Sequence, residues 1–335
     1  MRHWLCCDGG GTKLIVLLVN ERLEIVRSAT AGGVNPNFIA EEHIYRNMDF
    51  CIRSVMGLAD GAENAVPIET CFITMPSRTI YMNVTLEKNG IETEVKVMGE
   101  GQLGLLAGVF EREGFAALAG TGSDVFYIGP NGPLTVGGWG LMLGDEGSGS
   151  YVGRDGLVAA IRSVEGYGEQ TELLGEMLEW LGADKSEEPM RVMRGVLVPK
   201  VYEAASPRGV LASFVPRITR ACDRGDIVAR RILENAGADM GMQMVALIKR
   251  MLERDPRVID MPSTLCGGVW KSSRCMYRAY RDYVHNFYPC FNIQWPMFDA
   301  VAGAAVMIGF SLGYSKGEIR ARLSETFKDY LYPAE

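Results

Sequence analysis

The sequence predicts an α/β protein with two domains, and three observations support this prediction. The chain has 335 residues, which is enough for two domains that each bury a core. Short apolar segments typical of strands occur in two groups, with helical segments between and after them. Glycine-rich loops follow several of the expected strands, which favours a ligand cleft between the domains.

The first group of strands opens the chain. Three short apolar or β-branched runs are separated by turn residues and are expected to be strands: 3–7, 14–20 and 23–29. A helix is expected at about 40–58, where apolar residues recur at helical spacing. These residues are Ile44, Met48, Cys51, Ile52 and Val55. Further strands are expected at 70–75 and in the segments VTLE and TEVKVM within 84–98.

The second group of strands begins after Gly101, and a mainly helical region comes after it. Strands are expected within 114–128 and 133–140. The chain is then largely helical from about 151 to 258, including a long run from Asp226 to Arg254. The remaining expected elements are a strand and loop at 263–270, a helix at 271–287, a strand at 291–295, and helices at about 299–313 and 316–331, the last with Ser315 as its N-cap.

Composition, charge and cysteine usage disfavour several classes of protein. A net charge of −7 argues against a general nucleic-acid binder, because phosphate binding usually needs a basic surface. No apolar run is long enough to cross a bilayer, and Asp8 interrupts the apolar start, so we expect neither a membrane partner nor a signal peptide. The eight cysteines form no C-x-x-C pair, and the three histidines lack metal-ligand spacing. We therefore expect a cytoplasmic protein with reduced thiols.

The stretch DGGGTK is the first candidate site. Its residues are Asp8, Gly9, Gly10, Gly11, Thr12 and Lys13. The bare glycines let an anion approach the backbone, the threonine and lysine add a hydroxyl and a positive charge, and the aspartate can hold a hydrated Mg²⁺. This stretch matches neither a Walker A motif nor a G-x-G-x-x-G motif, which argues against a P-loop or a Rossmann site here. A glycine-rich β-hairpin without a ligand is an equal alternative at this point.

Three further loops shift the balance toward a ligand site. One follows an apolar strand and combines small residues with hydroxyls: Gly120, Thr121, Gly122 and Ser123. The diglycine Gly267–Gly268 lets a purine or ribose lie against the backbone. The segment 137–153 is the densest cluster of glycine and polar residues, and it carries Asp145. Several such loops are hard to explain as turns alone.

The order of these motifs resembles the family of N-acetylglucosamine kinases and BadF/BcrA-type ATPases. The motifs are DGGGTK, GTGS, GGWG with GDEGSG, and CGG, and the helical segment 212–240 is also similar to that family. The resemblance covers nearly the whole chain. It implies two ribonuclease-H-like domains of the actin-like ATPase type, with an interdomain cleft that closes over ATP. The domains are then expected at 1–105 with the C-terminal helices 302–331, and at 106–301.

The resemblance also implies a role for each loop. Gly9–Lys13 would bind the β- and γ-phosphates of ATP, with Asp8 facing Mg²⁺. Gly120–Ser123 would face the phosphates from the other domain, and Gly267 and Gly268 would flank the adenosine. Members of this family commonly form dimers, so a homodimer is among the partners that the resemblance implies.

An amino sugar is the substrate that the resemblance implies, with N-acetylglucosamine and its 6-phosphate the best single guess for substrate and product. The matching positions are Asn35, Gly140 and Asp145. Amides and carboxylates held by rigid loops suit a ligand rich in hydroxyls. The structural alternatives are an Asx-turn before Pro36 for Asn35 and a core anchor for Trp139.

Two departures from the family pattern fall near the acceptor. The family carries its catalytic aspartate in an N-D-A motif, whereas Gly99-Glu100-Gly101 stands here. Glu100 is therefore the expected catalytic base, although its side chain is one methylene longer and a shift of ~1 Å can cost about 100-fold in rate. Its alternative is a solvated glutamate in a glycine turn. The second departure is Met75-Pro76-Ser77, where the family usually has a G-L-A-G loop.

Three functions stay open on this evidence. The leading hypothesis is an ATP-dependent amino-sugar kinase. The second is a BadF-type ATPase that drives a partner's redox step through a cysteine-ligated cluster, which the settings of Cys222, Cys266 and Cys275 disfavour. The third is a nucleotide- or sugar-binding sensor that has lost the catalytic base, and the change at Glu100 is its main support.

Overall fold

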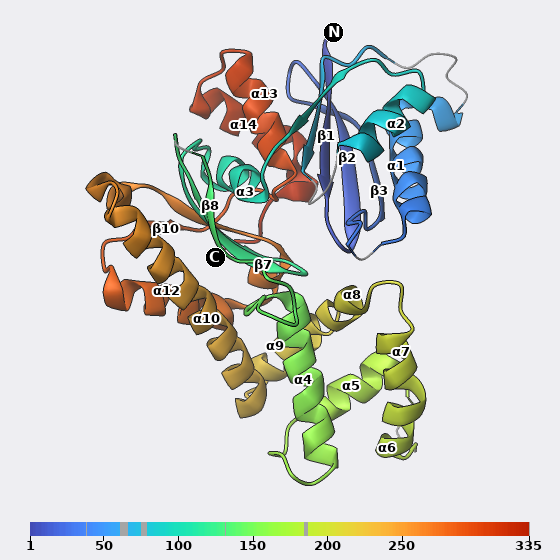
Figure 1. Cartoon of the computed structure of the whole chain (residues 1–335), viewed down its shortest axis with the longest axis vertical. Coiled ribbons are helices and arrows are strands. Elements are labelled where there is room, and N and C mark those ends of the chain that lie inside the picture. Colours follow the sequence, from blue (N-terminus) through green and yellow to red (C-terminus); the bar gives the residue numbers. More distant parts are fainter. Residues whose placement is uncertain (38, 61–65, 75–78, 131, 184–186, 335) are drawn as a thin grey trace. The chain divides into compact units, whose positions relative to one another are not determined.

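The computed structural model describes the chain except for residues 38, 61–65, 75–78, 131, 184–186 and 335 (Figure 1). The predicted departure at Met75-Pro76-Ser77 lies outside the described residues. The chain divides into two compact units: unit 1 is Met1–Glu113 with Gln294–Ala334, and unit 2 is Gly114–Ile293.

Unit 1 contains a five-stranded sheet in the order β3-β2-β1-β4-β5. The strands are β1 (His3–Gly9), β2 (Lys13–Asn20), β3 (Ile25–Gly32), β4 (Thr70–Thr74) and β5 (Glu94–Val97). The first three are antiparallel neighbours, whereas β4 runs parallel to β1 and β5 runs parallel to β4. Asp8 therefore lies opposite Thr74, at the carboxyl ends of two adjacent parallel strands.

Helices cover both faces of this sheet, because alternate strand residues point to opposite sides. One face packs against α1 (Glu41–Met56) and α2 (Ile80–Lys88), around Leu5 and Cys7 of β1 (Figure 1). The other face packs against α3 (Glu100–Val109), α13 (Ala302–Ser311) and α14 (Lys316–Thr326), around Trp4 and Cys6. Two short 3₁₀ turns, η1 (Leu58–Asp60) and η4 (Lys328–Tyr330), complete the unit.

Unit 2 has the same strand order in its own five-stranded sheet, β10-β9-β6-β7-β8. The strands are β6 (Gly114–Ala119), β7 (Ser123–Ile128), β8 (Leu134–Gly137), β9 (Ser263–Cys266) and β10 (Ile293–Gln294). Again the first three are antiparallel neighbours, and the fourth runs parallel to the first. Each sheet thus has the ribonuclease-H-like order that the resemblance implied, which confirms the predicted fold class.

The remaining helices belong to unit 2, most of them between β8 and β9. They are α4 (Gly149–Val164), α5 (Leu173–Leu181), α6 (Pro189–Val192), α7 (Val198–Tyr202), α8 (Pro207–Ala212), α9 (Val215–Asp223), α10 (Ile227–Leu252), α11 (Gly268–Ser272) and α12 (Arg274–Phe287), with a π-helical turn η2 (Met193–Leu197) and a 3₁₀ turn η3 (Pro256–Asp260). Among the described residues, no helix combines the length and apolar character that crossing a membrane requires.

Three element predictions need correction. The segment VTLE is not a strand but the end of α2, whose buried residues Tyr81, Met82, Thr85 and Leu86 follow helical spacing. The strand predicted at 23–29 begins at Ile25, because Leu23 occupies a left-handed turn with φ of 63°. The loop expected after β9 forms the short helix α11. The predicted N-cap is confirmed, since Ser315 and Glu318 form a capping box at the start of α14.

Candidate functional site

The glycine loop of unit 1 forms the turn of a tight hairpin between β1 and β2. The N–H of Gly10 donates to the Lys13 carbonyl at 2.9 Å, and the N–H of Val34 donates to the Gly10 carbonyl at 2.9 Å. A Cβ on Gly33 would lie 2.3 Å from the Gly11 carbonyl oxygen, so only glycine lets these two segments approach this closely. A Cβ on Gly10 would meet no described atom within 4 Å. The backbone is thus braced on one side and open to an approaching anion on the other.

The side chains that flank this loop differ in exposure. Thr12 and Lys13 are exposed, whereas Asp8 is partly buried in β1. Burial raises the pKa of Asp8 to about 6, and the charge of Asp299 adds to this rise while Lys13 opposes it. Asp299 lies between β10 and α13, so the end of the chain brings a second carboxylate toward Asp8.

Glu100 is the first residue of α3. It is therefore not the solvated glutamate in a glycine turn that was the alternative prediction. The preceding strand is fixed by the Met98 N–H, which donates to the Ile73 carbonyl at 2.8 Å. Glu100 is partly buried, and burial together with the charge of Asp8 raises its pKa to about 7. Asp8, Glu100 and Asp299 therefore share one electrostatic environment, although they come from three distant segments.

Asn35 forms the Asx-turn that the following Pro36 suggested in the sequence. Its Oδ1 accepts the Asn37 N–H at 3.0 Å, which is an Asx-turn, and its side chain is buried. The Val34 N–H bond to Gly10 brings the Asn35 turn next to the glycine loop. Asn35 thus lies near the glycine loop, and its contact with a sugar stays a prediction.

Unit 2 brings its own two glycine loops together. Gly267, with φ of 103°, follows β9, and a Cβ there would lie 2.3 Å from the Ala119 carbonyl oxygen at the end of β6. Gly268 begins α11, and a Cβ built on it would meet no described atom within 4 Å. Gly120 is next to Ala119, so both predicted nucleotide loops lie at the carboxyl ends of the adjacent parallel strands β6 and β9.

The loop at 120–123 is also bonded to the start of α4. The Gly149 N–H donates to the Gly120 carbonyl at 2.7 Å, and the Ser150 hydroxyl donates to the Thr121 carbonyl at 2.7 Å. Ser123 is fully buried, and its hydroxyl donates to the Glu146 carbonyl at 2.8 Å. Ser123 therefore holds the 145–150 segment against the loop through its side chain.

Asp145 lies buried beside this loop, and its carboxylate is held by two neighbours. Its Oδ1 accepts the Gly140 N–H at 2.9 Å, and its Oδ2 is paired with the Arg208 guanidinium of α8. A Cβ on Gly122 would lie 3.3 Å from Asp145 Oδ2 and 3.1 Å from Arg208 Nη2, so the ion pair touches the loop backbone. Burial raises the pKa of Asp145, while Arg208 and the Gly140 N–H oppose the rise. Asp145 also has a left-handed backbone, with φ of 61°, a strained conformation that is frequent at functional sites.

Trp139 is not the core anchor that the sequence suggested as an alternative. It is 73% exposed and lies on the loop after β8, together with Met142 and Leu143, which are even more exposed. The glycines on either side, Gly138 and Gly140, both have positive φ. The loop therefore turns its apolar side chains outward.

Sequence reasoning missed three residues at these sites. Thr74, Asp299 and Arg208 face Asp8 or Asp145 only because strand register and helix packing bring distant segments together. The sequence held a weak signal for one of them, since Asp299 is at the start of the helix expected at about 299–313, which packs on the first sheet.

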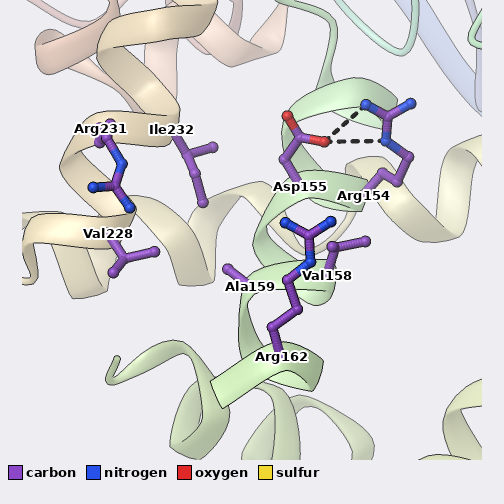
Figure 2. Close-up of a pocket in the computed structure, with 8 residues that line it drawn as sticks. All are labelled: Arg154, Asp155, Val158, Ala159, Arg162, Val228, Arg231 and Ile232. Atoms are coloured by element: carbon purple, nitrogen blue, oxygen red, sulfur yellow. Dashed lines mark hydrogen bonds and ion pairs between the residues drawn. The ribbon is translucent and has the colours of Figure 1, made fainter. Parts of the chain in front are cut away.

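A separate cavity of about 400 Å³ lies between α4 and α10 (Figure 2). Arginines and short apolar side chains line it, and Arg154 donates to Asp155 there at 3.0 and 2.8 Å. None of the predicted site residues lines this cavity.

Comparison with known proteins identifies relatives over nearly the full chain. A curated N-acetylmuramic acid/N-acetylglucosamine kinase of Clostridium acetobutylicum is 25% identical over 311 residues, which cover 92% of this chain and 98% of the relative. Candidate N-acetylglucosamine kinases of Chromobacterium violaceum and Porphyromonas gingivalis have similar structures, with TM-scores of 0.64 and 0.65 and identities of 21% and 18%. They cover 92% and 93% of this chain and 99% of their own chains.

A more distant structure has the same fold. The ROK family glucokinase of Streptomyces griseus, solved with glucose and AMPPNP, has a TM-score of 0.58 at 14% identity and covers 92% of this chain and 98% of its own. The family model described as the BadF/BadG/BcrA/BcrD ATPase family matches residues 5–308. The chain therefore belongs to the BadF/BadG/BcrA/BcrD ATPase family.

Proposed function

We propose that this protein is an ATP-dependent kinase of an amino sugar, with N-acetylglucosamine as acceptor and its 6-phosphate as product. The observation that carries the proposal is Glu100, a carboxyl group with a pKa of about 7 near Asp8 and the glycine loop. A pKa close to neutral suits a general base, because the group can both accept and release a proton. Membership of an ATPase family and the substrates named for the curated relative support the choice.

The loops supply the donor side of this proposal. Gly9, Gly10, Gly11, Thr12 and Lys13 would bind the terminal phosphates in unit 1. Gly120, Thr121, Gly122 and Ser123 would bind phosphate in unit 2, beside Gly267 and Gly268 for the adenosine. Backbone N–H groups and a lysine neutralise phosphate charge without covalent chemistry, and phosphoryl transfer depends mainly on such positioning.

Asp8 fits a role beside Mg²⁺. Oxygen ligands suit this ion, which usually keeps several waters and needs only one or two carboxylates besides the phosphates of a nucleotide. Within the described residues, no cluster of three or more His, Cys, Asp or Glu side chains is arranged to hold a metal. Asp8 would therefore be a single protein carboxylate beside an ion whose other ligands are waters and phosphate oxygens. When bound, Mg²⁺ would neutralise charge on the phosphates, and Asp8 would orient it through direct or water-mediated contact.

Glu100 would accept the proton of the acceptor hydroxyl as the hydroxyl oxygen attacks the γ-phosphorus. The oxygen–phosphorus bond forms, the bond to the β-phosphate oxygen breaks, and ADP leaves with that electron pair. Asn35, Gly140 and Asp145 would hold the sugar's other hydroxyl and amide groups. Glu100 has one methylene more than the family's aspartate, so its carboxylate can take more positions. Its backbone is fixed at the start of α3, which offsets part of this added side-chain freedom.

A coupled assay of ADP release tests this function. Purified protein with Mg²⁺-ATP should turn over when N-acetylglucosamine or N-acetylmuramic acid is added, and Glu100→Gln should lower kcat by about 100-fold or more while nucleotide binding is retained. Glu111→Gln serves as control, since Glu111 lies outside the site and is half-exposed in an ion pair with Lys316. If no amino sugar or hexose stimulates the wild type, the kinase assignment is wrong.

The same assay separates the two remaining hypotheses. Sugar-independent ATP turnover that Glu100→Gln does not change would favour the family's ATPase role. Tight sugar binding by calorimetry with no phosphorylated product would favour a sensor.

A further inference from the structure

The hydroxyl of Thr74 is buried without a hydrogen-bond partner among the described residues. Thr74 is 2% exposed, and its Oγ1 lies at the carboxyl end of β4. A buried hydroxyl that bonds to nothing costs free energy, so native proteins nearly always give it a partner. Its partner is therefore to be sought in a molecule that binds here.

The position of Thr74 points to the candidate site. It is paired in register with Asp8 of β1, and register partners on parallel strands point to the same face of the sheet. That face carries α3 and α13, because Phe72, two residues earlier, packs in the same core as both helices. The Thr74 hydroxyl and the Asp8 carboxylate therefore project side by side at one end of the sheet.

The start of α3 adds a second set of hydrogen-bond donors near Thr74. The Met98 N–H is bonded to the Ile73 carbonyl, so the chain leaves β5 beside the end of β4 and enters α3 at Glu100. The N-cap of α3 is Gly99, which supplies no side-chain cap. The first N–H groups of a helix carry partial positive charge and suit oxygen atoms of a ligand.

We propose that Thr74 is a ligand-binding residue whose hydroxyl bonds an oxygen of the bound substrates, either a hydroxyl of the sugar or a water molecule on Mg²⁺. This inference rests on the proposed function and adds a residue to it. A threonine hydroxyl is both donor and acceptor, so it can serve either oxygen.

The substitution Thr74→Val tests this role, and the chain offers a matched control. Thr85 is also 2% exposed and belongs to the same unit, but its hydroxyl donates to the Tyr81 carbonyl at 2.7 Å. Valine has the shape of threonine without the hydroxyl. Thr85→Val should lower Tm by about 2 °C or more and leave kcat/KM unchanged. Thr74→Val should leave Tm unchanged or raise it, and should lower kcat/KM about tenfold.

Thr74→Ser, which restores the hydroxyl, should recover most of the lost kcat/KM. The inference is overturned if Thr74→Val keeps wild-type kcat/KM and wild-type affinity for Mg²⁺-ADP. It is also overturned if Thr74→Ser is as impaired as Thr74→Val, because the hydroxyl then has no part in the effect.

Two further measurements distinguish the source of the oxygen. A raised KM for the sugar with unchanged dependence on Mg²⁺ concentration identifies the acceptor hydroxyl. A raised Mg²⁺ requirement, with weaker Mg²⁺-ADP binding by calorimetry, identifies a water on the ion. If the wild type phosphorylates no sugar, the proposed function fails, and the calorimetric comparison of wild type with Thr74→Val still tests this residue.

Discussion

Two carboxyl groups with raised pKa values set the chemistry of unit 1 at the scale of single residues. Burial is the main cause of the raised pKa of both Asp8 and Glu100. The charge of Asp299 adds to the rise at Asp8, and the charge of Asp8 adds to the rise at Glu100. Two ionised carboxylates in one buried region are unfavourable unless a cation or hydrogen-bond donors compensate. The pair is therefore suited to a site that binds positive charge and then accepts a proton.

The pKa of Glu100 predicts how activity depends on pH. A general base works only when ionised, so kcat/KM should rise about tenfold per pH unit below about 7 and level off above it. Ionisation of Asp8, with a pKa of about 6, should steepen the rise at lower pH. The profile is measured with saturating Mg²⁺-ATP from pH 5 to 9. A flat profile between pH 6 and 8 would contradict the assignment of Glu100 as base.

Arg208 is paired with the buried Asp145 and opposes the rise of its pKa, which leads to a second prediction. Arg208→Gln leaves a buried carboxylate without its countercharge, and breaking such a pair costs about 3–5 kcal/mol when it is fully buried. We expect a lower Tm and a raised KM for the sugar. Arg208→Lys should recover part of both. Asp145→Asn combined with Arg208→Gln should be less destabilised than the sum of the single variants, as thermal unfolding would show.

The sequence was informative at this scale where the signal was local. The contiguous loops at 8–13 and 120–123 could be predicted, because each loop's residue types are adjacent in the chain. Thr74, Asp299 and Arg208 could not, because their importance depends on register and packing. Arg208 is 63 residues from its partner Asp145, and no sequence spacing encodes that contact.

At the scale of elements, the junctions between strands and helices decide the shape of each site. Periodicity predicted the long elements well, such as α1 and α10, since each presents a repeating apolar face. It failed at α2, where the segment VTLE begins with two β-branched residues and was predicted to be a strand, although it belongs to a short helix. Short elements give periodicity too few repeats to separate the two structures.

The junction between β9 and α11 supplies the prediction for this scale. In Gly267→Ala, the new Cβ would lie 2.3 Å from the Ala119 carbonyl, at a φ of 103° that alanine rarely adopts. We expect destabilisation of about 1–3 kcal/mol and weaker ADP binding, because the loop at 120 must move. Gly313→Ala is the comparison, since it has a positive φ of 83° but open space around its Cβ. Equal effects of both variants in thermal unfolding and calorimetry would show that contact with Ala119 is unimportant.

At the scale of the whole molecule, the chain builds the same sheet order twice and returns to unit 1 with its last segment. The grouping of strands could be predicted from the sequence order, whereas the return of the last helices to the first domain was expected only from the family resemblance. The pairing of α13 and α14 with one particular face of the first sheet could not, because it depends on tertiary packing of apolar residues far apart in the chain.

Phe327, just after α14, tests the contribution of that returning segment. Phe327 is fully buried in the core it shares with β1 and α3. Phe327→Ala should destabilise the protein by about 3–5 kcal/mol through lost burial and a cavity. The exposed Leu331→Ala should change stability by less than about 1 kcal/mol. A small effect of Phe327→Ala in denaturant titration would show that the segment contributes little.

The discontinuity of unit 1 has a consequence during synthesis. A ribosome completes residues 114–293 before it makes α13 and α14, two of the three helices that cover Trp4, Cys6 and their neighbours. Unit 2 is contiguous, whereas the apolar face of the first sheet has only α3 to cover it until the last forty or so residues are made. Nascent chains that pause before residue 294 should therefore be the ones that recruit chaperones or aggregate.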